Sequence, residues 1–173
     1  MNRRIVLLAG LALLSLLAGT SAAQAQYGTV YNPYTGTTAV RETAYNPYTG
    51  TRGAETTAYN PYTGTHAAST TAVNPYTGAA AHSATAVNPY TGSAAHTESA
   101  YNPYTGTRAA SETTHNGYTG ATTNRTEAYN PYTGGKAASQ SYANPYTGTT
   151  AHAQEYHNPY TGNTAVHANV RRR

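Results

Sequence analysis

The chain of 173 residues contains no cysteine, tryptophan, phenylalanine or aspartate, and it has only one methionine. Without cysteine no disulfide can stabilise the fold, although an extracytoplasmic compartment would permit one. The six acidic residues are all glutamates and lie far apart in the sequence, and no serine occupies a G-x-S-x-G nucleophile elbow. A single active site also needs one unique, rigidly held constellation. We therefore expect no enzyme activity and no cofactor.

Aliphatic side chains are also scarce outside the N-terminus. Every leucine and the single isoleucine lie within positions 1–25, and the large apolar side chains after them are 18 tyrosines and six valines. An ordinary core depends on buried leucine or phenylalanine, each contributing about 1.5–3 kcal/mol, and this chain lacks them. Low aliphatic content is typical of disordered chains, whereas so many tyrosines are not.

The N-terminal segment, 1–25, has the pattern of a targeting sequence. Arg3 and Arg4 precede an apolar run at positions 5–18, and Ala23, Gln24 and Ala25 form a small-x-small cleavage site. A membrane-spanning helix needs about 20 apolar residues, so this run is too short. We expect a cleaved signal peptide at 1–25, containing a short helix. The mature chain, 26–173, would then have no transmembrane segment and be secreted or periplasmic in a bacterium.

The charge of the mature chain is small. The formal net charge is +4, and removal of Arg3 and Arg4 leaves eight cations against six glutamates, about +2. The cations cluster only in the C-terminal tail at 171–173, and nucleic-acid binding requires a basic stripe. We expect no nucleic-acid partner.

One pentapeptide, Asn-Pro-Tyr-Thr-Gly, recurs at every fourteenth position from 32 to 162. One copy departs from the pattern, because Gly117 replaces proline. Such unbroken spacing is a strong sign of a repeat architecture. The ten copies begin at Asn32, Asn46, Asn60, Asn74, Asn88, Asn102, Asn116, Asn130, Asn144 and Asn158.

Each pentapeptide predicts a chain reversal. Asparagine accepts backbone hydrogen bonds from the residues that follow, and proline fixes φ at about −65° to begin a type I turn. Glycine can then adopt the left-handed conformation. The predicted structural turn residues in the first three copies are Asn32, Pro33, Gly36, Asn46, Pro47, Gly50, Asn60, Pro61 and Gly64. A four-residue Pro-Tyr-Thr-Gly loop fits this order and favours an all-β antiparallel meander of about eleven short strands.

The spacers support this pairing. Symmetry about the Tyr–Thr bond places a tyrosine opposite a cation or histidine in four hairpins, and Ala58 opposite Ala67 in the next row. It also places Glu42 opposite Glu55, an unfavourable pair. The four tyrosine pairs are Tyr45 with Arg52, Tyr59 with His66, Tyr101 with Arg108 and Tyr129 with Lys136.

Two other architectures fit the same repeat. Each repeat could form one coil of a β-solenoid with the pentapeptide at one corner, or the mature chain could stay largely disordered. In the meander, reversal of each strand would place tyrosines and their partners on both faces of the sheet.

Seven histidines invite a metal-binding interpretation, but they occupy several different repeat positions. His82, His96 and His152 share one position and His115 and His157 share another, and His82 would not lie opposite His96. Zinc requires three or four converging ligands, so we expect no metal site. A small-ligand or metal-binding module and an ice-binding protein remain alternatives. The threonine after each corner glycine, which would form an ice-binding array, is missing in half of the copies.

The tenfold repetition favours a structural or interaction protein. Identical units raise avidity without a strong single site, and the partner would be an envelope polymer, a polysaccharide or the protein itself. The candidate contact residues are Tyr34, Tyr48 and Tyr62 in the corners and Tyr45, Tyr59, Tyr101 and Tyr129 on the strands. Packing within the chain is the competing role for these tyrosines.

Through its Asn-Pro-Tyr-Thr-Gly units and Ala/Thr spacers, nearly all of the segment 26–173 resembles the tandem NPYTG-type repeat regions of bacterial secreted and envelope proteins. This resemblance implies an extracytoplasmic setting. It implies no activity and no catalytic or binding residues.

Overall fold

The computed structural model describes residues 24–172, and this part of the chain is all-β. The predicted signal helix falls outside the described residues. The strands are β1 (Gln24–Tyr31), β2 (Thr38–Tyr45), β3 (Arg52–Tyr59), β4 (His66–Val73), β5 (Ala80–Asn88), β6 (Ser93–Asn102), β7 (Thr107–His115), β8 (Thr122–Tyr129), β9 (Lys136–Asn144), β10 (Thr149–Asn158) and β11 (Asn163–Arg171).

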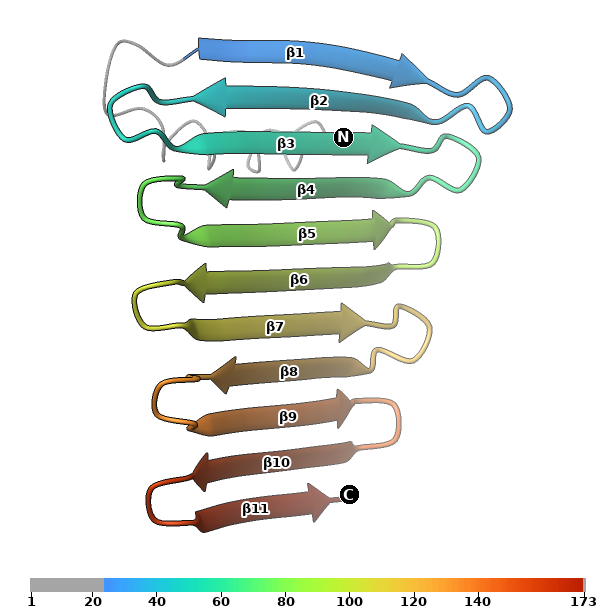
Figure 1. The fold of residues 1–173 in the computed structure, drawn as a ribbon. Coiled ribbons are helices and arrows are strands. Elements are labelled where there is room, and N and C mark those ends of the chain that lie inside the picture. Colours follow the sequence, from blue (N-terminus) through green and yellow to red (C-terminus); the bar gives the residue numbers. More distant parts are fainter. Residues whose placement is uncertain (1–23, 173) are drawn as a thin grey trace.

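The eleven strands form one open antiparallel sheet in sequence order, which confirms the predicted meander and excludes the solenoid (Figure 1). Turns alternate between two rims of the sheet. Rim A carries the turns that follow even-numbered strands, and rim B carries those that follow odd-numbered strands. Within residues 24–172 there is no helix of the length and apolarity that crossing a bilayer requires.

Each turn is organised by its asparagine side chain. At the β5–β6 corner, Asn88 Oδ1 accepts hydrogen bonds from the backbone N–H groups of Tyr90 at 3.0 Å and Thr91 at 3.2 Å. The other nine corners repeat this pair of bonds, including the proline-free corner at Asn116. The corner glycine closes the loop with φ between 60° and 68° in all ten copies, a conformation that glycine adopts without steric strain.

The register agrees with the symmetry about the Tyr–Thr bond. The four predicted tyrosine pairs are directly opposed, as are Ala58 with Ala67 and Glu42 with Glu55. Because no insertion interrupts any strand pair, the same symmetry applies across the sheet. The register of every hairpin therefore follows from its turn.

The sheet is a single layer without a conventional core. No side chain in the described part of the chain is fully buried. Both faces of the sheet carry exposed alanine, threonine and serine, so stability depends on backbone ladders and on contacts between neighbouring repeats.

Corners on the same rim also pack against one another. A Cβ on Gly36 would lie 3.0 Å from Tyr62 Cε2 and 3.1 Å from Pro61 Cγ, so the next corner of rim B rests on this glycine. Glycine is thus required at the corner both for its positive φ and for this close approach.

The proline-free corner is the tightest of these contacts. Gly117 N–H donates a hydrogen bond to Ser93 Oγ at 3.3 Å, and a Cβ on Gly117 would overlap the carbonyl oxygen of Thr91. Glycine therefore replaces proline at position 117, where the backbone of this corner contacts the neighbouring β5–β6 corner on rim B.

The first strand begins at Gln24, two positions before the expected start of the mature chain. Cleavage after Ala25 would remove the pairs that Gln24 and Ala25 make with Tyr45 and Ala44. The rest of β1, from position 26 to 31, would remain to pair with β2.

We expect Asn88→Ala to lower the free energy of unfolding by about 1 kcal/mol, because two corner N–H groups lose their acceptor. Urea unfolding followed by circular dichroism measures the change. Asn169→Ala, on the exposed edge strand β11, is the matched control and should change stability by less than about 0.5 kcal/mol. Equal losses of unfolding free energy in the two variants would show that the hydrogen bonds to the corner asparagine do not stabilise the fold.

Gly117→Pro restores the consensus pentapeptide, yet we expect it to destabilise the chain by about 1–3 kcal/mol through overlap with the neighbouring corner. It also removes the N–H that bonds to Ser93. A gain of about 0.4–1 kcal/mol in the same urea experiment, the usual benefit of proline at a compatible turn, would contradict the observed contact.

Candidate binding surfaces

The register assigns every strand residue to one of two faces, because directly opposed residues share a face and neighbours along a strand alternate. We call the face that carries Tyr45 and Arg52 face 1, and the opposite face, which carries Tyr59 and His66, face 2. The predicted tyrosine pairs therefore occur on both faces of the sheet.

A continuous row of mostly large side chains crosses face 1 beside rim A. We call it the tyrosine–cation row. It consists of Tyr45, Arg52, Val73, Ala80, Tyr101, Arg108, Tyr129, Lys136 and His157, each directly opposite the next.

Within this row each lysine or arginine lies over the ring of its hairpin partner. Arg108 Cζ is 5.4 Å from the ring centroid of Tyr101, and Lys136 Nζ is 5.7 Å from that of Tyr129. Arg52 and Tyr45 repeat the contact at 5.7 Å. Cation–π pairs at exposed sites contribute about 0.5–1 kcal/mol each, so these tyrosines already have partners within the chain.

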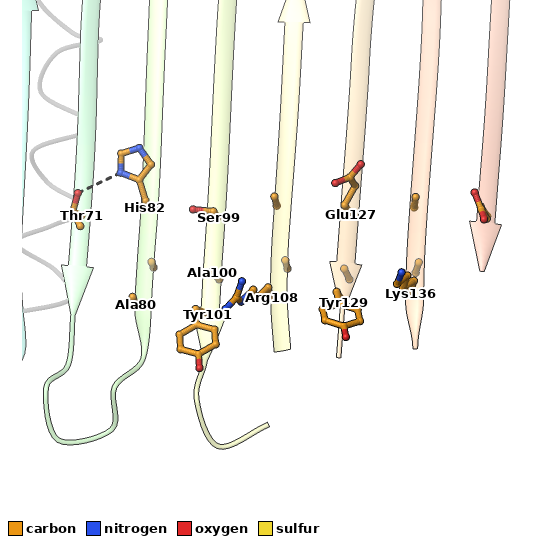
Figure 2. A pocket seen from close by; sticks show the side chains of 17 residues that line it. Thr71, Ala80, His82, Ser99, Ala100, Tyr101, Arg108, Glu127, Tyr129 and Lys136 are labelled. Carbon is orange, nitrogen blue, oxygen red and sulfur yellow. Dashed lines mark hydrogen bonds between the residues drawn. The ribbon is translucent and has the colours of Figure 1, made fainter. Parts of the chain in front are cut away.

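Figure 2 shows the shallow groove that this row borders on face 1, with a volume of about 640 Å³. Tyr101, Arg108, Tyr129 and Lys136 form one side of the groove. On the other side lie polar groups of the next row, including Glu127 and His82, whose Nδ1 is 3.3 Å from Thr71 Oγ1. The groove combines aromatic rings, cations and carboxylates with an open floor that includes the backbone at Ala100, Ala109 and Ala128, whose side chains point to face 2.

Face 2 carries the corresponding row beside rim B. Tyr59 stacks on His66 with ring centroids 4.5 Å apart and an interplanar angle of 27°. Val87 and Ala94 continue the row. This row has no lysine or arginine until Arg171 at the end of β11.

The corner tyrosines behave differently from the strand tyrosines. All ten are between 70% and 94% exposed, whereas Tyr59, Tyr101 and Tyr129 are about 40% exposed. Rim A carries Tyr48, Tyr76, Tyr104, Tyr132 and Tyr160, and rim B carries Tyr34, Tyr62, Tyr90, Tyr118 and Tyr146. Turns on one rim are two strands apart, so successive corner tyrosines lie about 10 Å apart.

The seven tyrosines expected to make contacts thus fall into two groups. Tyr34, Tyr48 and Tyr62 project from the rims, on which five tyrosines each are brought into line. Tyr45, Tyr59, Tyr101 and Tyr129 are engaged with a cation or histidine on the sheet.

Charge separates between the faces in a way that sequence reasoning missed. Face 1 carries five strand cations (Arg41, Arg52, Arg108, Arg125, Lys136) and three glutamates (Glu112, Glu127, Glu155). Face 2 of strands β1–β10 carries three glutamates (Glu42, Glu55, Glu98) and no lysine or arginine. The sequence does contain this division of charge. The residues of one face occupy odd positions in one strand and even positions in the next.

The histidines do not converge on a metal site in residues 24–172, where no three histidine, cysteine or acidic side chains form a cluster. His82 lies on face 1 opposite Ser99, and His96 lies on face 2 opposite Thr85, as expected for residues out of register. The threonines considered for ice binding form hydroxyl pairs in five corners divided between the two rims, so they make no regular lattice.

Comparison of the chain with protein-family models, with curated proteins and with solved structures gives no match.

The pair of opposed glutamates on face 2 is an electrostatic conflict within the sheet. Burial, and then repulsion from Glu42, raise the pKa of the Glu55 carboxyl above its usual value of 4.5. The protonated form is therefore favoured by folding. The stability that the protonated Glu55 carboxyl contributes is fully present when the pH is below its usual pKa. It is lost as the pH rises through the raised pKa of Glu55 in the folded state.

We expect Glu55→Gln to stabilise the fold by about 0.5 kcal/mol at pH 7, where the like-charged pair is removed. The gain should disappear below the usual carboxyl pKa, because Glu55 is then neutral in both states. Thermal unfolding of both proteins at pH 7 and pH 3 measures this difference. A gain that persists unchanged in acid would point to packing rather than charge.

Proposed function

We propose that the protein is a secreted or periplasmic structural and interaction protein that binds a linear envelope polysaccharide through its two rims of corner tyrosines. The observation that carries this proposal is the contrast between the two kinds of tyrosine. Tyr45, Tyr59, Tyr101 and Tyr129 are paired with a cation or histidine within the sheet, and the other strand tyrosines are at most 68% exposed. The ten corner tyrosines, by contrast, project from the sheet with 70–94% of their surface exposed.

The geometry of a rim suits a polymer better than a small molecule. Five aromatic rings stand in line at intervals of about 10 Å, two strand spacings. An extended β-1,4-linked glycan presents the same face of its sugar rings once per disaccharide, at a similar interval. Tyrosine offers an apolar ring face to a sugar together with a hydroxyl that can hydrogen-bond.

Repetition compensates for the weakness of each contact. A single exposed ring on an exposed sugar gives little affinity, but linked contacts raise the overall affinity by about 10²–10⁴-fold when their spacing matches. The corner interactions fix the backbone position from which every ring projects, since each asparagine and glycine sets one turn. The NPYTG-type resemblance and the expected signal peptide support an extracytoplasmic location for such contacts.

We expect replacement of the five rim A tyrosines by alanine, with rim B intact, to weaken sedimentation with purified peptidoglycan sacculi by about ten-fold or more, because the protein is then held by one rim instead of two linked rims. Tyr76→Ala alone should have an effect below about three-fold, since four rings on rim A and all five on rim B remain. The five-fold phenylalanine variant keeps the ring faces and is the matched control, which should still bind.

Two results would contradict this proposal. Failure of the unmodified protein to sediment with sacculi, or to bind chitin and cellulose, would exclude a β-1,4-linked glycan as the partner. Undiminished binding by the rim A alanine variant and by the matching rim B variant would exclude the corner tyrosines as the contact surface.

A further inference from the structure

Among residues 24–172 no second layer covers either face of the sheet. The shapes and charges of the two faces complement each other. We propose that copies of this chain stack face to face, with face 1 of one copy on face 2 of the next, in the same orientation. This inference goes beyond polysaccharide binding, because stacking uses the two faces and leaves the rims exposed.

Each face of the sheet is large enough to form a stable interface. Ten strand spacings of about 4.8 Å and strands about 27 Å long give each face roughly 1,300 Å². A stable protein interface covers about 800 Å² on each partner, so one face provides enough area. Because no side chain in residues 24–172 is fully buried, a second sheet would also create the core that the single layer lacks.

The two faces are also complementary in shape. Beside rim A, the tyrosine–cation row of face 1 lies directly behind a row of small residues on face 2. From β2 to β9 the small row consists of Ala44, Gly53, Ala72, Ala81, Ala100, Ala109, Ala128 and Ala137, and on β10 it ends at Tyr156, behind His157. A copy translated along the sheet normal therefore places Tyr101 over Ala100, and Arg108 over Ala109, of its neighbour.

The same relation holds beside rim B, with the faces exchanged. There the small row is on face 1 from β2 to β6 (Ala39, Ala58, Ala67, Ala86, Ala95), and Tyr59, His66 and Val87 stand behind it on face 2 of β3–β5. Beyond β6 the face 1 row continues with Thr114, Thr123 and Tyr142. Large side chains meet small ones at both ends of the strands, which is how packed layers interdigitate. Identical copies also have identical twist, so a translated sheet follows the surface below it.

The two faces differ in charge as well. Face 1 has five cations against three carboxylates, and face 2 of β1–β10 has three carboxylates with no lysine or arginine. Translation places Arg41 of one copy over Glu42 of the next, beside its pairing partner Glu55. The like-charged pair of a single sheet would thereby gain a cation.

This contact is head-to-tail. The copy at one end of a stack therefore has a free face 1, the copy at the other end has a free face 2, and each can bind a further copy. Such heterologous contacts continue without closure and produce a filament. The sheets would lie about 10 Å apart along the filament axis, with strands and backbone hydrogen bonds both perpendicular to that axis. In cross-β fibrils, by contrast, the backbone hydrogen bonds run along the axis.

A charge exchange tests the contact. Arg41→Glu and Glu42→Arg each place like charges across the interface, so each variant alone should need an about ten-fold higher concentration to assemble. An equimolar mixture should regain assembly, because the carboxylate introduced in the first variant then meets the guanidinium introduced in the second. Arg172→Glu, the same charge change beyond β11, is the control and should assemble normally. Sedimentation velocity of the full chain, in the form that its host produces, measures assembly.

Two further measurements keep the test decisive. Circular dichroism establishes whether each variant retains its sheet. If a charge variant does not fold, Ala109→Tyr provides the test instead, because its larger side chain fills the small row and should block assembly. Diffraction from oriented filaments should place the reflection at about 10 Å on the meridian.

A monomer at all concentrations, a mixture that does not recover, or a meridional reflection at about 4.8 Å would overturn stacking. The rim variants test polysaccharide binding, and the face variants test stacking. Either proposal can therefore fail without the other.

Discussion

The whole structure depends on one local constraint, the hydrogen bonds from two backbone N–H groups to the asparagine side chain at each corner. This bond pair fixes the start of the turn, and the glycine with positive φ completes it. Because the turn has a fixed length, it sets the register of its hairpin, and the register in turn sets which side chains share a face. Ten repetitions at one spacing extend these consequences over eleven strands.

This arrangement gives a sheet whose stability is distributed rather than concentrated in a core. Backbone ladders, cation–π contacts such as Arg108 with Tyr101, and the packing of one corner on the glycine of another each contribute a small amount. The same arrangement leaves two large faces and two lines of exposed tyrosines available. The proposed functions assign the lines of tyrosines to a polymer and the faces to further copies of the chain.

Much of this could be predicted from the sequence, because the relevant interactions are local. The order Asn-Pro-Tyr-Thr-Gly specifies a four-residue loop, and the match of Tyr45 with Arg52 and of Ala58 with Ala67 identifies the register. The division of charge between faces follows from the same register but was missed, because residues of one face alternate between odd and even positions in successive strands. The contact of Gly117 with Ser93 could not be predicted, since it joins corners that only the folded sheet brings together.

The most direct test of the meander is a set of spin-label distances between corner residues. Labels at positions 48 and 62, in successive repeats, should lie on opposite rims at about 27 Å or more, the length of a strand. Labels at positions 48 and 104, much farther apart in the sequence, should lie on the same rim at about 19 Å, four strand spacings. The meander predicts narrow distance distributions for both pairs, with the distance between 48 and 62 longer than that between 48 and 104. A shorter distance between 48 and 62 than between 48 and 104, or broad distributions for both pairs, would contradict the meander.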